Sequence, residues 1–87
     1  RTDQEELPIS RFEDLDVETV ELKVSSESKY LRKKYSLDKI PKELCVAVII
    51  REDEIIIPNS YSEIIMDDEL LIITKEEYIP IAEKLFQ

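Results

Sequence analysis

Three short apolar runs, all rich in β-branched residues, constrain the fold of this chain most. They are Leu44–Ile50, Ile55–Ile57 and Leu70–Ile73. Such runs are shorter than most helices, and β-branched side chains favour an extended backbone. We therefore expect three strands, with the polar residues 51–54 joining the first two as a β-hairpin. Because the first and third runs show no polar alternation, they predict strands buried on both faces of a sheet.

A fourth strand is expected near the start of the patterned sequence. From Val17 onward, Val20, Leu22 and Val24 alternate with polar residues, which is the period of a strand buried on one face. Residues 59–69, which separate the hairpin from the last apolar run, are expected to form a loop.

Two helices are expected. A short one should span about residues 32–40 and stop at Pro41, which cannot continue a helix. Thr74 with Glu77 fits a capping box for a second helix. Pro80 must either kink that helix or lie in its first turn. Its apolar face has helical spacing and consists of Tyr78, Ile81, Ala82 and Leu85.

The resulting order is β-α-β-β-β-α, an α+β domain in which both helices pack on a four-stranded sheet. The chain has 87 residues, enough for one domain. We assign residues 1–13 to a linker or leading arm and residues 14–87 to the domain. A core this small is thin, so pairing with a second subunit is expected to matter. The chain starts with Arg1, and we expect it to be a fragment of a longer protein.

Composition excludes several classes of function. Twenty-one acidic residues oppose 12 basic ones, and a net charge of −9 repels nucleic acid and anionic lipid. The absence of His removes the commonest general base and makes a zinc site implausible. The single cysteine, Cys45, cannot form an internal disulfide and is expected to be buried. No membrane span or signal peptide is visible. We therefore expect no catalytic residues, no metal and no direct nucleic acid contact.

The chain has no glycine, so its tight turns depend on Asp, Asn or Ser. Asp53 is expected to adopt the left-handed conformation in the hairpin turn. Without a glycine-rich loop, the basic residues Lys29 and 32–34 favour a solvated helix face over a phosphate site. The acidic groups 52–54 and 67–69 favour solvated turns over a cation site.

Arg51 is the most informative polar residue, because it closes an apolar strand shortly before Pro58 and Asn59. A guanidinium and an amide beside apolar walls can hold an anionic ligand. The walls would come from Val46, Ala47, Ile49 and Ile50. Alternatively, Arg51 pairs with Glu52 or Glu54 at the turn.

These residues also resemble a known family. Residues 45–59 are similar to the core hairpin of the TrkA-C (RCK-C) domain, in which a Val/Ile-rich strand ends in Arg and an Ile-x-x-Pro strand follows. Residues 67–73 resemble its later strand and residues 81–86 its closing helix. Residues 34–37 stand where the family often has Gly-Lys-Ser/Thr-Leu. The resemblance spans Val17 to Phe86, although Lys34, Asp53 and Asp67 replace the family's glycines.

The resemblance implies a cytosolic regulatory domain of a potassium channel, a potassium-uptake system or a cation/proton antiporter. Such domains form homodimers and bind a small effector between subunits, cyclic di-AMP in some members and cations in others. We expect no resident cofactor, and a membrane transport subunit as partner, so that the domain lies in the cytoplasm at the inner face of the membrane. The expected ligand-binding residues are Val46, Ala47, Ile50, Arg51, Ile57, Pro58 and Asn59.

Two other functions remain open. The lost glycines suggest a purely structural dimerisation module whose ligand site has decayed. The same domain type also serves as a sensor attached to DNA-binding repressors.

Overall fold

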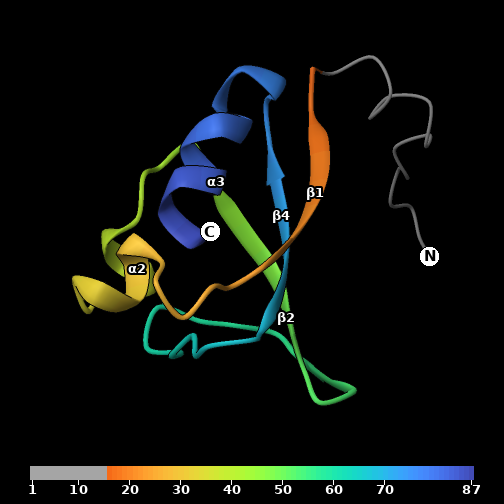
Figure 1. Cartoon of the computed structure of the whole chain (residues 1–87). Coiled ribbons are helices and arrows are strands. Elements are labelled where there is room, and N and C mark those ends of the chain that lie inside the picture. Colours follow the sequence, from red (N-terminus) through yellow and green to blue (C-terminus); the bar gives the residue numbers. More distant parts are fainter. Residues whose placement is uncertain (1–15) are drawn as a thin grey trace, which may run out of the picture.

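A computed structural model describes residues 16–87, so the predicted leading arm, residues 1–13, lies outside the described residues. The described part has a four-stranded antiparallel sheet and two α-helices, which confirms the α+β class (Figure 1). Two single 3₁₀ turns accompany them. In chain order the elements are β1 Glu18–Lys23, α2 Lys29–Arg32, η1 Leu37–Lys39, β2 Cys45–Arg51, β3 Glu54–Ile56, β4 Glu69–Thr74, η2 Glu76–Tyr78 and α3 Ile79–Phe86.

The sheet has the order β1-β4-β2-β3, which places β4 between β1 and β2. The predicted hairpin is confirmed: β2 and β3 pair antiparallel, with Arg51 opposite Glu54. Both residues of the connecting turn are left-handed, with φ of 48° at Glu52 and 70° at Asp53. Two left-handed residues form the turn whose twist matches that of paired strands. The prediction for Asp53 is therefore confirmed.

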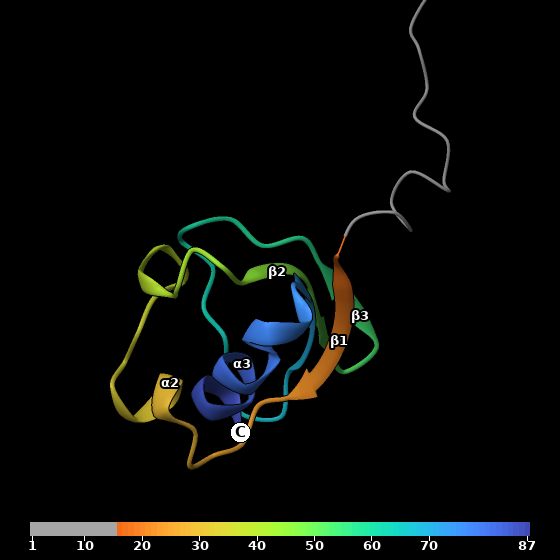
Figure 2. The ribbon, with the colours of Figure 1, turned by 90° about the horizontal axis from the view of Figure 1, so that it is seen from above.

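The core lies on one face of the sheet, where α3 packs against β1 and α2 packs against α3 (Figures 1 and 2). The predicted alternation is confirmed at the end of β1 and just beyond it, because Leu22 and Val24 are buried whereas Glu21 and Lys23 are exposed. The buried apolar residues are Leu22, Val24, Tyr30, Leu44, Ile49, Ile64, Leu70, Ile72, Ala82, Leu85 and Phe86.

No described helix covers the opposite face of the sheet, so the prediction that β2 and β4 are buried on both faces is wrong. In β4, Leu70 and Ile72 are buried, whereas Ile73 is 39% exposed. Cys45 lies opposite Ile73 and is exposed, which corrects its predicted burial. An unbroken apolar run is compatible with a strand that is buried on both faces. It is equally compatible with a strand whose second face is not covered by any other described residue.

The first helix ends much earlier than predicted. α2 stops at Arg32 because Lys34 turns left-handed, with φ of 55°. The Tyr35 N–H donates to the Tyr30 carbonyl at 3.1 Å and the Lys34 N–H to the Leu31 carbonyl at 3.2 Å. These two bonds are those of a Schellman cap, with Lys34 where glycine is usual. After Arg32, the last residue of α2, the predicted helical span of residues 32–40 holds only the 3₁₀ turn η1.

The second helix begins beside its proline. Pro80 occupies the first turn of α3, where its missing N–H costs nothing, so the kink is not formed. The predicted capping box is wrong. Thr74 is instead the last residue of β4, and its hydroxyl donates to the Glu43 carbonyl at 2.7 Å. Among residues 16–87, no helix has the length and apolar character needed to cross a membrane.

Candidate functional site

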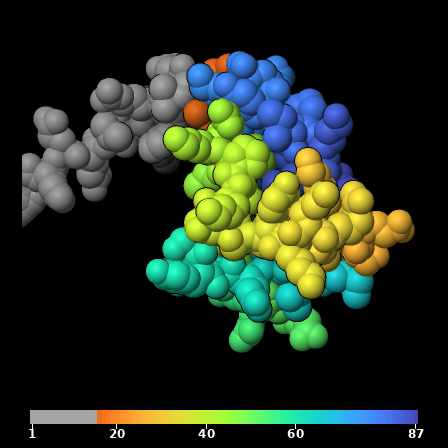
Figure 3. All heavy atoms as spheres, turned by 90° about the vertical axis from the view of Figure 1, so that its left-hand side faces the viewer, coloured from red at the N-terminus to blue at the C-terminus, as the bar shows by residue number. Residues whose placement is uncertain are grey.

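A cleft of about 400 Å³ brings together three of the predicted site residues, Val46, Pro58 and Asn59. It lies on the face shown in Figure 3, where the segment around η1 meets the chain that leaves β3. Most of its remaining wall is apolar and was not predicted. The other lining residues are Leu37, Asp38, Ile40, Pro41, Lys42, Leu44 and Ser60.

The strand register explains why these three residues meet and why Arg51 is separate from them. Since Ile49 lies opposite Ile56, the antiparallel chain after β3 runs back toward the start of β2. Asn59 therefore comes level with Val46, whereas Arg51 stays at the turn. Arg51 lies five positions after Val46 along the strand, which corresponds to about 17 Å. The expectation that Arg51 lies beside Pro58 and Asn59 is wrong.

Asn59 is held by its own turn. Its Oδ1 accepts a hydrogen bond from the Tyr61 N–H at 2.8 Å, and its backbone N–H donates to Ser62 Oγ at 2.9 Å. This arrangement is an Asx turn, which uses the side-chain oxygen to support the backbone. Among the hydrogen bonds of residues 16–87, none involves Nδ2. The amide therefore keeps two donors for a bound molecule.

Two charged side chains line the same cleft, Lys42 and Asp38. The Ser36 hydroxyl donates to Asp38, and this bond lowers the pKa of the carboxyl below its ordinary value despite slight desolvation. Lys42 supplies an exposed positive charge beside Pro41. No sequence motif surrounds Lys42, so only the fold identifies it as a residue that lines the cleft.

Arg51 binds a carboxylate of its own chain instead of a turn acid. Its Nε and Nη2 donate to the two oxygens of Asp68, each at 2.8 Å, and Nη2 also donates to the Glu63 carbonyl at 3.0 Å. The Asp68 side chain is 1% exposed and that of Arg51 is 31% exposed. A bidentate pair of this geometry is strong and directional. It joins the end of β2 to the loop before β4.

Asp68 is a buried acidic residue that the sequence did not single out. Burial raises the pKa of its carboxyl. The hydrogen bonds from Arg51 and from the Ile65 N–H, together with the charge of Arg51, lower the pKa by more than burial raises it, so the net shift is downward. The same hydrogen bond to Asp68 is the main reason that the pKa of Arg51 is raised. The expected solvated turn at 67–69 is therefore wrong for Asp68, while Asp67 and Glu69 are exposed.

The other predicted residues lie outside the cleft. Ala47 and Ile50 are half-buried in β2, and Ile57 is 72% exposed just beyond β3. The basic residues Lys29 and 32–34 are all exposed, as a solvated surface requires. Among residues 16–87, no three acidic or cysteine side chains gather as they would around a metal ion.

No family model matches the chain, and comparison with curated proteins finds no match either. The resemblance to the TrkA-C domain therefore rests on the residues and their order alone.

Proposed function

We propose that this chain is a dimerising, effector-binding regulatory domain of a potassium or other cation transport system, located in the cytoplasm. The observation that carries the proposal is the convergence of Val46, Pro58 and Asn59 in one cleft. These residues stand at the places that the resemblance to the TrkA-C domain marks for ligand contact. The apolar wall suits a flat base, and the Asn59 amide suits its polar edge.

The uncovered face of the sheet supports the dimeric part of the proposal. Register places the outward side chains of three strands side by side, from Cys45 and Ile73 across Leu71 and Val48 to Ile50 and Ile55. Ile55 is 72% exposed and Ile73 is 39% exposed. A contiguous apolar surface of this kind is characteristic of an interface between subunits. A second copy would offer the same surface and so complete a two-fold symmetric contact.

The effector part is tested with cyclic di-AMP by titration calorimetry on the whole 87-residue chain. One ligand should bind per dimer. Asn59→Asp keeps the oxygen that accepts from Tyr61 but replaces the amide donors with negative charge, so affinity should fall at least tenfold. Lys42→Gln should weaken binding by at least about tenfold, as expected for the loss of one charged contact to phosphate. Lys75→Gln, outside the cleft, removes the same charge and should leave affinity unchanged.

One observation favours a second function, a purely structural dimerisation module. The Arg51 guanidinium is committed to Asp68 and Glu63 within its own chain. A structural module would form the dimer and show no heat of binding with cyclic di-AMP. A monomer that also fails to bind would contradict both functions.

A further inference from the structure

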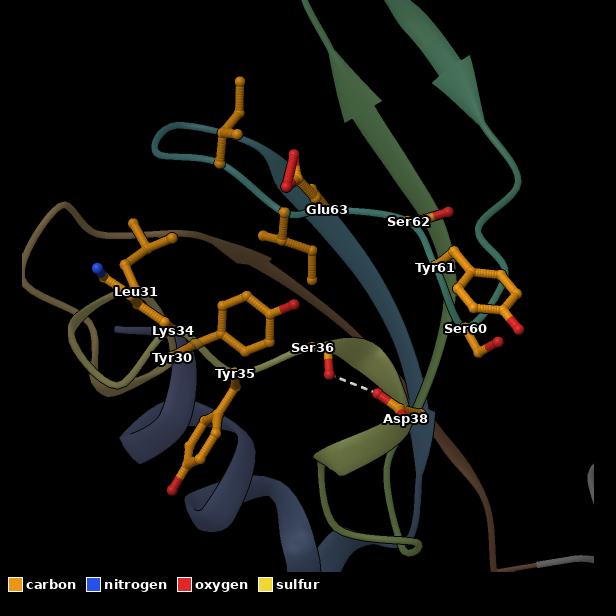
Figure 4. Close-up of a pocket in the computed structure, with 12 residues that line it drawn as sticks. Tyr30, Leu31, Lys34, Tyr35, Ser36, Asp38, Ser60, Tyr61, Ser62 and Glu63 are labelled. Carbon is orange, nitrogen blue, oxygen red and sulfur yellow. Dashed lines mark hydrogen bonds between the residues drawn. The ribbon is translucent and has the colours of Figure 1, made fainter.

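A second, larger cleft adjoins the first and shares Asp38 and Ser60 with it. Its volume is about 640 Å³, within the range of small-molecule sites. Residues 30–38 form one wall and residues 60–65 the other (Figures 3 and 4). None of the ligand-binding residues predicted from the sequence lines it.

A buried hydroxyl group without a hydrogen-bond partner makes this cleft a candidate binding site. Tyr30 is only 2% exposed, yet its Oη makes no hydrogen bond with any described residue. Its ring is fixed against Phe86, with the ring centres 5.4 Å apart, and against Tyr35 at 6.2 Å. Figure 4 shows the hydroxyl directed into the cleft, on the side of Ser36. Buried polar groups in folded proteins nearly always have a partner, so this one is suited to a ligand atom.

The charges around the hydroxyl define the ligand. Of the 12 lining residues, two are anionic, Asp38 and Glu63, and one is cationic, Lys34. Figure 4 shows the Lys34 ammonium pointing away from Tyr30. Burial first, and then the charges of Glu63 and Asp38, raise the pKa of the Tyr30 hydroxyl, so it is neutral and its oxygen can accept a hydrogen bond. The net charge of −9 adds to the attraction for a cation.

We propose that this cleft binds a small organic cation. Its ammonium group donates to Tyr30 Oη and is balanced by the carboxylates of Asp38 and Glu63. Its apolar body packs on Leu31 and Ile64. An ammonium has three donors and no acceptor, which matches a cleft lined by a buried hydroxyl that can accept and by two exposed carboxylates. This proposal does not depend on the function proposed above, which uses the neighbouring cleft.

Three probes of nearly equal shape test the charge preference by NMR on the whole chain. They are benzylamine, benzyl alcohol and benzoate, which are cationic, neutral and anionic at pH 7. Benzylamine should shift the backbone amide signals of residues 30–38 and 60–65 in a saturable way, and benzoate should not. Equal or tighter binding of benzoate, saturable shifts confined to other residues, or no saturation by benzylamine would overturn the proposal.

Tyr30→Phe removes only the hydroxyl and separates a ligand role from a structural one. We expect about fivefold weaker binding of benzylamine, the value of one hydrogen bond, with a melting temperature that is equal or higher. A lower melting temperature with unchanged affinity would make the hydroxyl structural and overturn its assignment.

Charge variants provide a second test if Tyr30→Phe does not fold. Asp38→Asn and Glu63→Gln should each weaken benzylamine binding two- to fivefold. Glu76→Gln, in η2 and outside the cleft, removes the same charge and should have no effect. If all three variants weaken binding equally, the attraction is a general property of the acidic chain, and the cleft is not the site.

Discussion

Several residues other than glycine have a left-handed backbone, which lowers the free energy of unfolding. Lys34, Glu52, Asp53 and Asp67 all have positive φ. Asp tolerates this conformation because its short side chain bonds nearby backbone, whereas Lys and Glu gain no such compensation. The free energy lost is therefore greatest at Lys34 and Glu52.

Lys34→Gly should stabilise the domain, because glycine adopts the capping conformation at φ of 55° without steric cost. We expect the free energy of unfolding to rise by about 0.5–1 kcal/mol, measured by urea denaturation. Lys33→Gly is the matched control. Lys33 loses the same charge at the adjacent position, but its φ is −92°, so glycine there should be neutral or destabilising. Equal effects of the two substitutions would attribute the change to charge.

Asp68 should make stability depend on pH. The pKa of its carboxyl is lowered in the folded state, so the stabilisation it gives is complete above about pH 4, near the unfolded pKa. That stabilisation should be lost as pH falls through the lower folded pKa. At pH 7, Asp68→Asn should cost about 1.5–3 kcal/mol, the value of hydrogen bonds to a charged group.

Urea denaturation between pH 7 and pH 2 measures this contribution. The wild-type chain should lose more stability below pH 4 than Asp68→Asn does. Asp67→Asn provides the control, because Asp67 is exposed and Asn also accepts its left-handed backbone. If Asp67→Asn flattened the pH profile as much as Asp68→Asn, the effect would belong to the general charge of the chain.

At the scale of elements, the sequence predicted strands better than helices for a physical reason. The alternation in β1 and the β-branched runs report burial directly, and the spacing of the runs leaves room only for a tight hairpin. The end of α2 has no such signal, because the usual marker of a left-handed cap is glycine and Lys34 takes its place. Thr74 fitted a capping box by spacing alone, but pairing of β4 with β1 extends the strand through it.

The strand β4 should be the element most sensitive to loss of side-chain volume. Ile72 is fully buried at the centre of the sheet, between Val20 and Val46. Ile72→Ala should lower the free energy of unfolding by about 2–5 kcal/mol, through lost burial and the cavity left behind. Ile81→Ala removes the same atoms from a residue that is 40% exposed in α3, and should cost much less. Urea denaturation of both variants gives the comparison.

For the molecule as a whole, the sequence predicted one part of the candidate site and missed another. Val46, Pro58 and Asn59 converge because antiparallel register follows from the hairpin, which the sequence shows. The partner of Arg51 could not be predicted in the same way. It is Asp68, which lies 17 residues away in a run of three acidic residues that look alike in sequence. Only the packing of the loop against the end of β2 distinguishes the buried Asp68 from its exposed neighbours. Lys42 and Tyr30 likewise acquire their places from tertiary contacts.

The uncovered sheet face leads to a prediction about the assembly. Sedimentation of the 87-residue chain at micromolar concentration should give twice the monomer mass, because an apolar face of three strands is costly to leave in water. Ile73→Lys places a charge on that face, beside Cys45, and should give a monomer. Ile81→Lys introduces the same charge at a residue of α3 that is equally exposed, 40% against 39%, and should leave the dimer intact. A wild-type monomer at about 100 µM, or a dimer that only Ile81→Lys disrupts, would place the interface elsewhere or exclude it.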